Sequence, residues 1–150
     1  MILLPRRCML AIAAVVDVAL HARPTPVAAK ALAARHSLPP RHLETLLQAL
    51  VRANILKGVR GPRGGYELAR ERRRITVAEI VRAAIHDADT EMASSEPDSQ
   101  LLTEVVSPLV AEAGTGFLAA LNTTSVDDLC EQARQKGAAA ARMGDVDFTI

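Results

Sequence analysis

Two short segments of this sequence hold the side chains best suited to chemistry, and that chemistry is recognition by hydrogen bonds and charge. Residues 41–52 bring together guanidinium, imidazole, hydroxyl and amide groups at helical spacing, and residues 57–64 are basic and rich in glycine. Guanidinium and amide groups pair with base edges in a DNA major groove, and lysine and arginine also bind phosphates. The candidate DNA-binding residues are therefore Arg41, His42, Thr45, Gln48, Arg52, Lys57, Arg60, Arg63 and Gly64.

A single helix is predicted to position the first segment. At about 100° per residue, one face of this helix is apolar and the opposite face is polar. The apolar set is Leu43, Leu46, Leu47, Leu50 and Val51, and the polar set is Arg41, Glu44, Thr45, Gln48 and Arg52, with His42 on the flank. Arg41 suits guanine and Gln48 suits adenine, while Glu44 either accepts from cytosine or only adjusts the local charge. A polar helix face is also typical of plain solvated surface, so the function depends on the neighbouring segments.

The second segment is predicted to be the loop of a β-hairpin. Residues 55–68 contain two short apolar runs around Arg60-Gly61-Pro62-Arg63-Gly64-Gly65, a pattern typical of a hairpin with an extended loop. Arg60 and Arg63 lie at its tip, where the glycines allow a close approach to another surface. A basic loop of this kind fits a DNA minor groove. A nucleotide-binding phosphate loop is not favoured, because the GxxxxGKS/T pattern is absent.

The charge distribution divides the 150-residue chain into a basic part and an acidic part. Residues 1–85 carry 15 Lys and Arg against 5 Asp and Glu, a net charge of +10, and residues 86–150 carry 3 against 12, a net charge of −9. A basic unit of this strength indicates binding to nucleic acid. It also suits a protein-interaction module that docks an acidic partner or the chain's own acidic half, and this alternative stays open.

The sequence has none of the patterns that point to an enzyme. Paired carboxylates, a nucleophile elbow and a phosphate loop are missing, and the four histidines lack metal-ligand spacing, so we expect no catalysis, metal or cofactor. Cys8 and Cys130 form no CxxC pair, and reduced thiols are typical of a cytoplasmic protein. A basic pair, Arg6 and Arg7, beside Cys8 favours a lowered pKa of its thiol, so redox sensing through Cys8 is a second alternative. A buried structural cysteine is the commoner case, particularly for Cys130.

Three short helices are predicted ahead of the hairpin. The first spans about residues 5–22, the second begins with Thr25 as N-cap and Pro26 at its first position and ends near Arg35, and the third spans residues 39–54. The second and third helices are joined by a short turn, so they fit a helix-turn-helix.

The apolar run at residues 8–16 follows two arginines and is similar to a secretory signal sequence. Asp17 and His21 interrupt this pattern, and the run is too short to span a bilayer. We therefore expect a buried amphipathic helix and no membrane association.

The acidic part is predicted to hold a long helix whose apolar positions suit a seam with a partner. Thr76 and Glu79 form a capping box for a helix that ends near Ile85, and residues 86–99 are expected to be an acidic linker. A long helix with apolar positions at three- and four-residue spacing follows at residues 100–121. The residues of this seam, which become the candidate dimer interface under the family resemblance described below, are Leu102, Val105, Val106, Leu109, Ala113 and Phe117.

Further signals set the remaining boundaries. Pro108 is expected to kink the long helix, and Ser125 to cap a last short helix. The predicted division is a DNA-binding domain, a linker, dimerisation helices and a tail, at residues 1–85, 86–99, 100–134 and 135–150 respectively.

A resemblance to a known family rests on several blocks of residues. These are Asp17-Val18-Ala19-Leu20, Leu43-Glu44, Leu46-Leu47, Val59-Arg60-Gly61-Pro62-Arg63-Gly64-Gly65-Tyr66, residues 76–84 (TVAEIVRAA) and residues 116–129 (GFLAALNTTSVDDL). The block at residues 59–66 is the most specific. Together the blocks cover most of residues 9–130, and the chain resembles the Rrf2 family of small bacterial-type winged-helix regulators.

The resemblance implies a mostly α-helical fold with a small β-hairpin wing, in which a winged helix-turn-helix domain precedes a long C-terminal dimerisation helix. It also implies a homodimer that binds double-stranded DNA at a palindromic operator and regulates transcription. Members of the family act as repressors or activators, and a repressor is expected here. The third helix would enter the major groove and the wing the adjacent minor groove.

The sequence departs from the family in two places. Sensors of this family hold an iron-sulfur cluster with three cysteines in the span that matches residues 86–101, and this chain has no cysteine there, so we expect no cluster. Cys8, Met9 and Leu10 stand where the family commonly has Gly, Arg and Tyr, so DNA contacts from that helix start are either lost or supplied by the preceding arginines.

Overall fold

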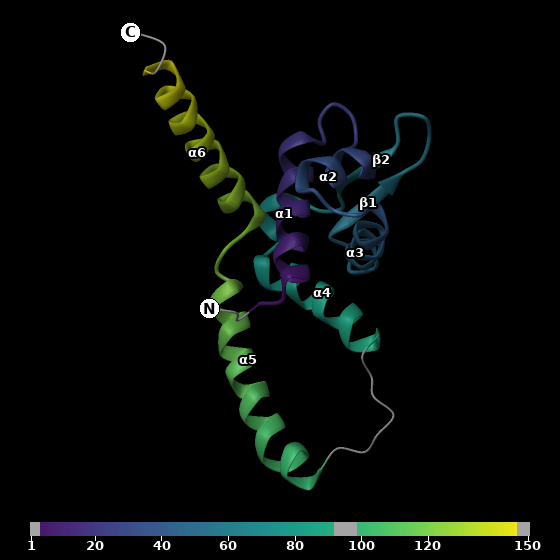
Figure 1. Ribbon diagram of the computed structural model, residues 1–150, viewed down its shortest axis with the longest axis vertical. Helices are drawn as coiled ribbons and strands as arrows, with labels where there is room; N and C mark the ends of the chain where they lie inside the picture. Colours follow the sequence, from purple (N-terminus) through teal and green to yellow (C-terminus); the bar gives the residue numbers. More distant parts are fainter. Residues whose placement is uncertain (1–3, 92–98, 147–150) are drawn as a thin grey trace.

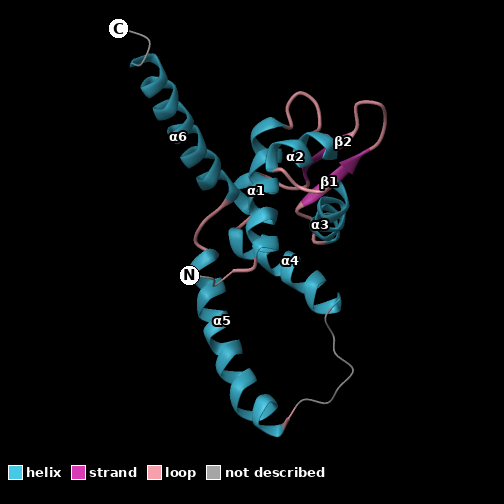
Figure 2. Cartoon of the chain, viewed as in Figure 1, coloured by secondary structure: helices cyan, strands magenta, loops and turns pink. Residues whose placement is uncertain are grey.

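The computed structural model describes residues 4–91 and 99–146, which form helices around one small β-hairpin (Figures 1 and 2). In chain order the elements are α1 (Arg6–His21), α2 (Ala29–His36), α3 (Pro40–Arg52), β1 (Leu56–Val59), β2 (Gly65–Leu68), a 3₁₀ turn η1 (Arg72–Arg74), α4 (Val77–Glu91), a π-helical turn η2 (Leu102–Val106), α5 (Ser107–Leu121) and α6 (Val126–Val146). The predicted fold class, mostly α with a two-stranded hairpin, is confirmed.

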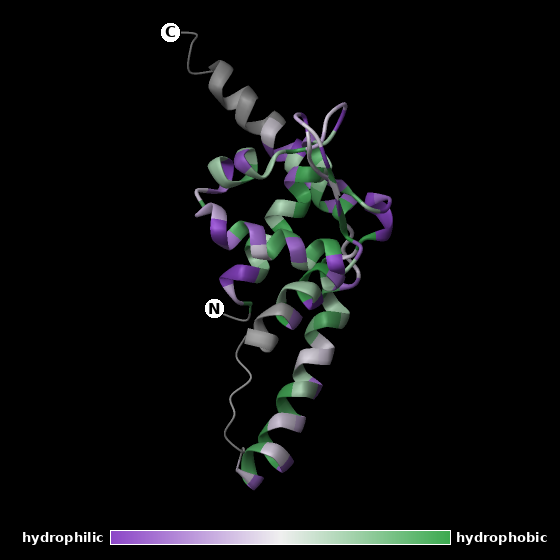
Figure 3. Cartoon of the chain, turned by 90° about the vertical axis from the view of Figure 1, so that its right-hand side faces the viewer, coloured by the Kyte–Doolittle hydropathy of each residue, from purple (hydrophilic) through white to green (hydrophobic). Residues whose placement is uncertain are grey.

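The core forms around α1, whose apolar residues recur at helical spacing. Ala11, Val15 and Val18 of α1 are fully buried, and α3 and α4 pack against this helix. The buried leucines of α3, the isoleucines at positions 75 and 80, and Val126 and Cys130 of α6 complete the core, around which apolar stretches of the helices gather (Figure 3). Burial of these apolar side chains is the main force that fixes α3 against the body.

The second helix begins later than the sequence predicted. Thr25 and Pro26 do not start it, because α2 begins at Ala29. The preceding Val27 pairs with Tyr66 of β2 instead: each backbone N–H donates to the other residue's carbonyl oxygen, at N···O distances of 2.9 and 2.8 Å. The hairpin therefore has a short third line of backbone pairing, which attaches it to the helix-turn-helix.

The third helix and the hairpin agree with the prediction. Pro40 occupies the first turn of α3, where a missing N–H costs nothing. β1 and β2 pair antiparallel, from Leu56 opposite Leu68 to Val59 opposite Gly65, and leave residues 60–64 as the loop.

The fourth helix is longer than predicted. Its capping box forms as expected, since the Glu79 N–H donates to Thr76 Oγ1 at 3.3 Å and the Thr76 N–H donates to Glu79 Oε2 at 2.9 Å. The helix then continues to Glu91, so residues 86–91 of the expected linker are helical. Neither glycine nor proline occurs in this stretch to end the helix, and propagation is favourable once a helix exists. Residues 92–98 lie outside the described residues.

Proline changes the hydrogen bonding of the long helix at residues 100–121. Just before Pro108, residues 102–106 form a π-helical turn, in which the Ser107 N–H donates to the Leu102 carbonyl five residues back. Proline has no N–H, and its ring would clash with the carbonyl four residues earlier. The wider turn accommodates both constraints, as π-bulges commonly do.

The last helix was predicted to be short, with residues 135–150 as an unassigned tail, and this is wrong. The Ser125 and Asp128 capping box forms, with N···O distances of 2.9 and 3.2 Å, but α6 runs for 21 residues to Val146. Gly137 does not end the helix, because one glycine costs only about 1 kcal/mol relative to alanine.

A short backbone contact attaches the turn between α5 and α6 to the winged-helix part. The Val77 N–H donates to the Thr124 carbonyl at 2.9 Å, and the Val126 N–H donates to the Ile75 carbonyl at 2.9 Å. We call residues 75–77 and 124–126 the junction. Its hydrogen bonds are reinforced by Asn122, whose side-chain oxygen accepts from Thr76 Oγ1 at 3.1 Å.

Candidate nucleic-acid interface

The helix α3 presents its predicted polar face to solvent. Its four leucines at positions 43, 46, 47 and 50 are buried, whereas Arg41, His42 and Gln48 are exposed and Thr45 is half-buried. The Thr45 hydroxyl donates to the Arg41 carbonyl at 3.3 Å, which leaves its oxygen able to accept a further hydrogen bond. The structure therefore brings the four candidate base-contacting residues together on one surface of α3.

The hairpin extends from the body beside α2 and α3, with its loop free of other elements (Figure 2). Arg60 and Arg63 are exposed in this loop, and Gly61 there has a φ of 122°. Within the described parts of the chain, no acidic side chain forms an ion pair with Arg41, Arg60 or Arg63. Arg41, Arg60 and Arg63 thus offer charge that no described acidic side chain pairs with, and this charge is available to an anionic partner.

Two glycines allow the hairpin loop to fold and the hairpin to pack against the backbone of Val27. A Cβ on Gly64 would lie 2.3 Å from the Val59 carbonyl oxygen, and a Cβ on Gly65 would lie 2.3 Å from the Val27 carbonyl oxygen. Neither backbone oxygen can move without breaking the loop or the pairing of Val27 with Tyr66. Gly64 was predicted as a contact to DNA, and its packing inside the loop is a structural reason for glycine at that position.

The two predicted phosphate-binding residues differ in their surroundings. Arg52 is exposed at the end of α3, near the start of the hairpin. Lys57 Nζ lies 2.9 Å from Glu67 Oε1 on the paired strand. Because Glu67 offsets part of its charge, Lys57 offers less attraction to a phosphate than the arginines of the loop do.

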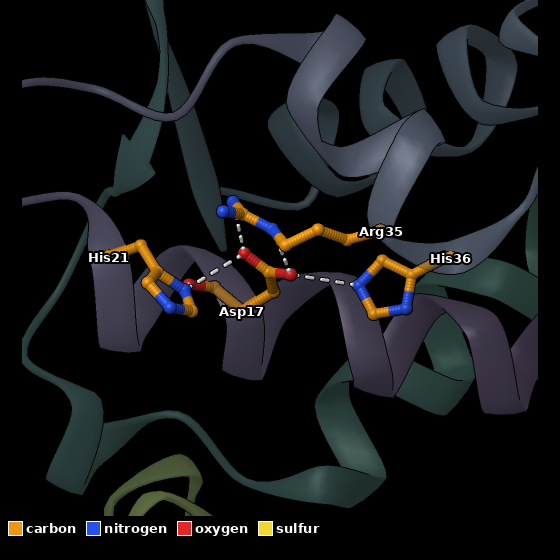
Figure 4. Close-up of polar contacts among 4 residues, drawn as sticks. All are labelled: Asp17, His21, Arg35 and His36. Atoms are coloured by element: carbon orange, nitrogen blue, oxygen red, sulfur yellow. Dashed lines mark hydrogen bonds and ion pairs between the residues drawn. The ribbon is translucent and has the colours of Figure 1, made fainter.

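A buried carboxylate that the sequence analysis did not single out joins α1 to α2 (Figure 4). Asp17 is only 7% exposed, and its two oxygens accept from Arg35 Nη2 at 2.7 Å and Arg35 Nε at 2.9 Å. His36 Nε2 lies 3.0 Å from one of these oxygens and His21 Nδ1 lies 3.1 Å from the other. Bidentate arginine–carboxylate pairs are strong and directional, so Asp17 fixes the first helix of the helix-turn-helix against α1.

The acidic part of the chain contacts the basic part away from α3 and the loop. Asp127 of α6 lies 2.6 Å from Arg72 Nε and 3.7 Å from Arg73 Nε, both in η1. Asp127 thus joins α6 to the winged-helix part by opposite charge.

The predicted activation of Cys8 by neighbouring arginines is wrong. Cys8 is 1% exposed, and burial raises the pKa of its thiol above the ordinary value by more than Arg7 lowers it. Burial likewise raises the pKa of Cys130, which is fully buried in α6. Reactive cysteines are exposed thiolates, so these two thiols do not have the properties of redox sensors.

The residues present do not fit a thiolate-bound cluster. Both cysteines are buried, in α1 and α6, and neither lies in the span that matches the cluster ligands of the family. Across the residues that the structure describes, no group of three or more histidine, cysteine, aspartate or glutamate side chains is placed to hold a metal ion.

The long helix exposes an apolar face. Side chains at Leu109, Val110 and Val105 are 67%, 62% and 58% exposed, and Leu102 and Val106 are near 40%. Residues 102–121 are long and apolar enough to cross a membrane by length and composition, and none of this stretch is buried. The helix also contains Glu104 and Glu112, and charged groups are costly inside a bilayer. An exposed apolar face of this size on a single subunit marks an interaction site.

A helix-turn-helix, α2 and α3, followed by a hairpin that projects beside the second helix, defines a winged helix-turn-helix protein. A profile of the Rrf2 family, described as iron-dependent transcriptional regulators, matches residues 4–132. The chain belongs to this family of transcriptional regulators.

Curated relatives agree with the family assignment. The chain is 32% identical over 116 residues to the HTH-type transcriptional regulator IscR of Xenorhabdus nematophila, covering 75% of this chain and 71% of the relative. It is 34% identical over 128 residues to a putative HTH-type transcriptional regulator of Synechocystis sp., covering 84% and 86% of the two chains. A putative HTH-type transcriptional regulator of Azotobacter vinelandii is 38% identical over 79 residues, which span 53% of this chain and 48% of that relative.

Solved structures agree with the fold. The T. potens IscR structure superposes with a TM-score of 0.65 at 28% identity, covering 87% of each chain. The global cysteine regulator CymR of B. subtilis gives a TM-score of 0.64 at 22% identity over 88% of this chain and 98% of that chain, and at this identity it supports the fold alone.

Proposed function

We propose that this protein is a sequence-specific DNA-binding repressor in the cytoplasm, which acts as a homodimer on an inverted-repeat operator. One observation carries the proposal: Arg41, His42 and Gln48 of α3 are exposed beside a projecting loop that carries Arg60 and Arg63. These arginines have no acidic partner within the described chain, so their charge is available to DNA.

The proposed DNA contacts divide into those that position the protein on DNA and those that read the base sequence. Arg60 and Arg63 are assigned to the minor groove, where a narrow groove concentrates negative potential. Arg41 and Gln48 are assigned to base edges in the major groove, where bidentate pairs to guanine and adenine discriminate between bases. Arg52 is assigned to phosphate, which adds affinity that falls as the salt concentration rises.

The dimer is proposed to form through the exposed apolar face of the long helix. Its candidate residues Leu102, Val105, Val106 and Leu109 are exposed along one helix, and burial against a second copy would remove them from water. A two-fold axis between the subunits requires an operator with two inverted half-sites, about one helical turn apart or more.

Binding is proposed to need no iron-sulfur cluster, since the chain's thiols do not fit one. Chelation of iron from the purified protein is therefore expected to leave its affinity for DNA unchanged.

The proposal is tested with two arginine variants and a matched control, using fluorescence anisotropy at two salt concentrations. Arg63→Ala is expected to weaken binding to every sequence and to lower the salt slope by about one. Arg41→Ala is expected to cost about 1–3 kcal/mol on the operator and to relax the preference at one position of each half-site. Arg23→Ala, an exposed residue in the loop after α1, serves as the control and is expected to bind like the parent.

Two outcomes contradict this assignment. Unchanged affinity in both arginine variants would show that the surface does not contact DNA. Absence of binding by the unaltered protein at low salt would favour a protein-interaction module, which uses the same charged surface for an acidic protein partner.

A further inference from the structure

A cavity of about 550 Å³ lies between the start of α1, the turn that joins α2 to α3, and the first half of α3. Its described lining consists of Arg6, Arg7, Leu10, Ser37, Leu38, Pro39, His42, Leu43, Thr45 and Leu46. Cavities of roughly 300–1,000 Å³ are the size that proteins use for small-molecule ligands. This cavity is separate from the hairpin loop, but it shares His42 and Thr45 with the proposed DNA-contacting face.

The lining is divided by chemistry. Leu43 and Leu46 are buried, Leu10 and Leu38 are half-buried, and together they give the cavity an apolar wall. Arg6, Arg7 and His42 supply cationic groups or hydrogen-bond donors, and no residue of the described lining is acidic. An apolar wall beside guanidinium groups is complementary to a molecule with an anionic head and an apolar body.

We propose that this cavity is an effector site for a small organic anion, a carboxylate on an apolar body, whose binding competes with DNA. A DNA phosphate would use the guanidinium groups alone, whereas the four leucines offer contacts that only an apolar body can make. The regulatory half of this inference rests on the proposed function, because a ligand beside His42 and Thr45 changes transcription only if α3 contacts DNA.

The effect on DNA follows from mutual exclusion. A ligand that holds its head between Arg6 and His42 occupies space beside the first half of α3, and it neutralises positive charge that attracts the DNA backbone. Whatever binds the DNA-free form and not the DNA-bound form must weaken DNA binding to the same extent that DNA weakens ligand binding. The anion would therefore release the repressor from its operator.

Ligand binding is measured first without DNA, with octanoate and 4-phenylbutyrate as probes and their uncharged amides as controls. Both acids are expected to bind at millimolar concentrations, to shift the methyl NMR signals of Leu10 and Leu38, and to bind at least tenfold more tightly than the amides. Arg6→Gln is expected to reduce the affinity for the acids at least tenfold and leave that for the amides unchanged. Arg23→Gln, an arginine outside the cavity, is expected to match the parent.

A second variant guards against loss of the fold. Leu10→Trp fills the cavity while keeping both arginines, and circular dichroism melting checks that it remains folded. The Leu10→Trp variant is expected to bind neither the acids nor the amides. If the acids bind the parent and Leu10→Trp equally, if acids and amides bind alike, or if no probe shifts the Leu10 and Leu38 signals, the inference is wrong.

The DNA measurement separates this inference from the proposed function. Octanoate is expected to raise the dissociation constant for operator DNA in the parent and not in Leu10→Trp. Loss of DNA affinity in Arg6→Gln with no probe binding to the parent would assign the cavity to a DNA phosphate instead. Probe binding without any DNA binding would support the ligand site and overturn the proposed repressor.

Discussion

Asp17 shows how one residue can position a recognition surface without contacting the ligand. Its carboxylate is buried between α1 and α2, where it accepts from Arg35 and lies within hydrogen-bonding distance of His21 and His36 (Figure 4). Because α2 packs against α3, the position of α3 depends on this contact. From the sequence, Asp17 only argued against a signal sequence. The residues beside it in the chain do not reveal that Arg35, 18 positions further on, is its partner.

Replacing Asp17 with asparagine is expected to lower the free energy of unfolding by about 1–2 kcal/mol. Hydrogen bonds to charged groups contribute about 1.5–3 kcal/mol, and water screens part of this because the Arg35 side chain is 41% exposed. Urea denaturation measures the change. Glu71→Gln is the control, because Glu71 is 77% exposed and lies 3.8 Å from its arginine. Equal effects of the two variants would contradict the role assigned to Asp17.

Glu79 is expected to make stability depend on pH. Partial burial acts to raise the pKa of Glu79, but the hydrogen bond from the Thr76 N–H and the contact with Arg70 outweigh it and hold the pKa below its ordinary value. A lowered folded-state pKa gives stability that is present above the unfolded-state pKa and is lost as the pH falls through the folded-state pKa. Melting between about pH 5 and pH 3, on either side of the usual glutamate value, should therefore depend less on pH in Glu79→Gln. Glu112→Gln, at an exposed position of α5, should keep the parent's profile.

At the scale of elements, helix positions were easier to predict than helix boundaries. The polar face of α3 and its four buried leucines were predicted from spacing alone, because a 3.6-residue period requires no knowledge of the rest of the chain. Val51 was placed on the apolar face wrongly, since it is 38% exposed near the end of the helix. The start of α2 was wrong, because Val27 pairs with Tyr66, which lies far away in the sequence. The end of α4 was wrong because residues 86–91 contain no glycine or proline to stop a helix, and the end of α6 was wrong because Gly137 is too weak a signal to stop one.

The pairing of the hairpin with Val27 gives a matched test at two glycines. Gly65→Ala places a methyl group 2.3 Å from the Val27 carbonyl oxygen, so the backbone must move, and the expected cost is about 1–3 kcal/mol. Gly58→Ala, in the same hairpin, has nothing within 4 Å of the new Cβ and should change stability by less than about 0.5 kcal/mol. Thermal melting checks the stability of both variants, and anisotropy checks whether only Gly65→Ala weakens DNA binding. Equal melting temperatures would show that the hairpin does not depend on this contact.

At the scale of the whole molecule, the opposite charges of the basic and acidic parts have two uses. Some of them pair with each other inside the molecule, and others remain available for a partner. The contact between Asp127 and Arg72 uses some of the opposite charge to hold α6 against the winged-helix part. The arginines of α3 and the hairpin loop remain outside that contact. Net charge alone could not distinguish these two uses, because it does not show which arginine lies near which carboxylate.

The apolar face of α5 is expected to hold two subunits together. Leu109→Arg places a charge where Leu109 is 67% exposed in a single subunit, and light scattering should then report a monomer with at least tenfold weaker operator binding. Ala111→Arg, at an exposed position outside the candidate interface, should remain dimeric. A monomeric parent protein, or a dimeric Leu109→Arg variant, would contradict the proposed interface.

The junction has a consequence for the spacing of target sites. Its backbone hydrogen bonds hold the turn after α5 to the strand-like segment before α4, so a winged-helix part cannot swing freely on the helix that would bind its partner copy. In such a dimer the junction would fix the distance and the orientation between the two recognition helices, one α3 in each subunit. Inserting one base pair between half-sites turns one of them by about 36° around the DNA axis, as follows from a helical repeat of about 10 base pairs. Because the junction holds each winged-helix part firmly, its stiffness would set how far the spacing between half-sites can change before DNA binding is lost. That stiffness comes from residues 75–77 and 124–126.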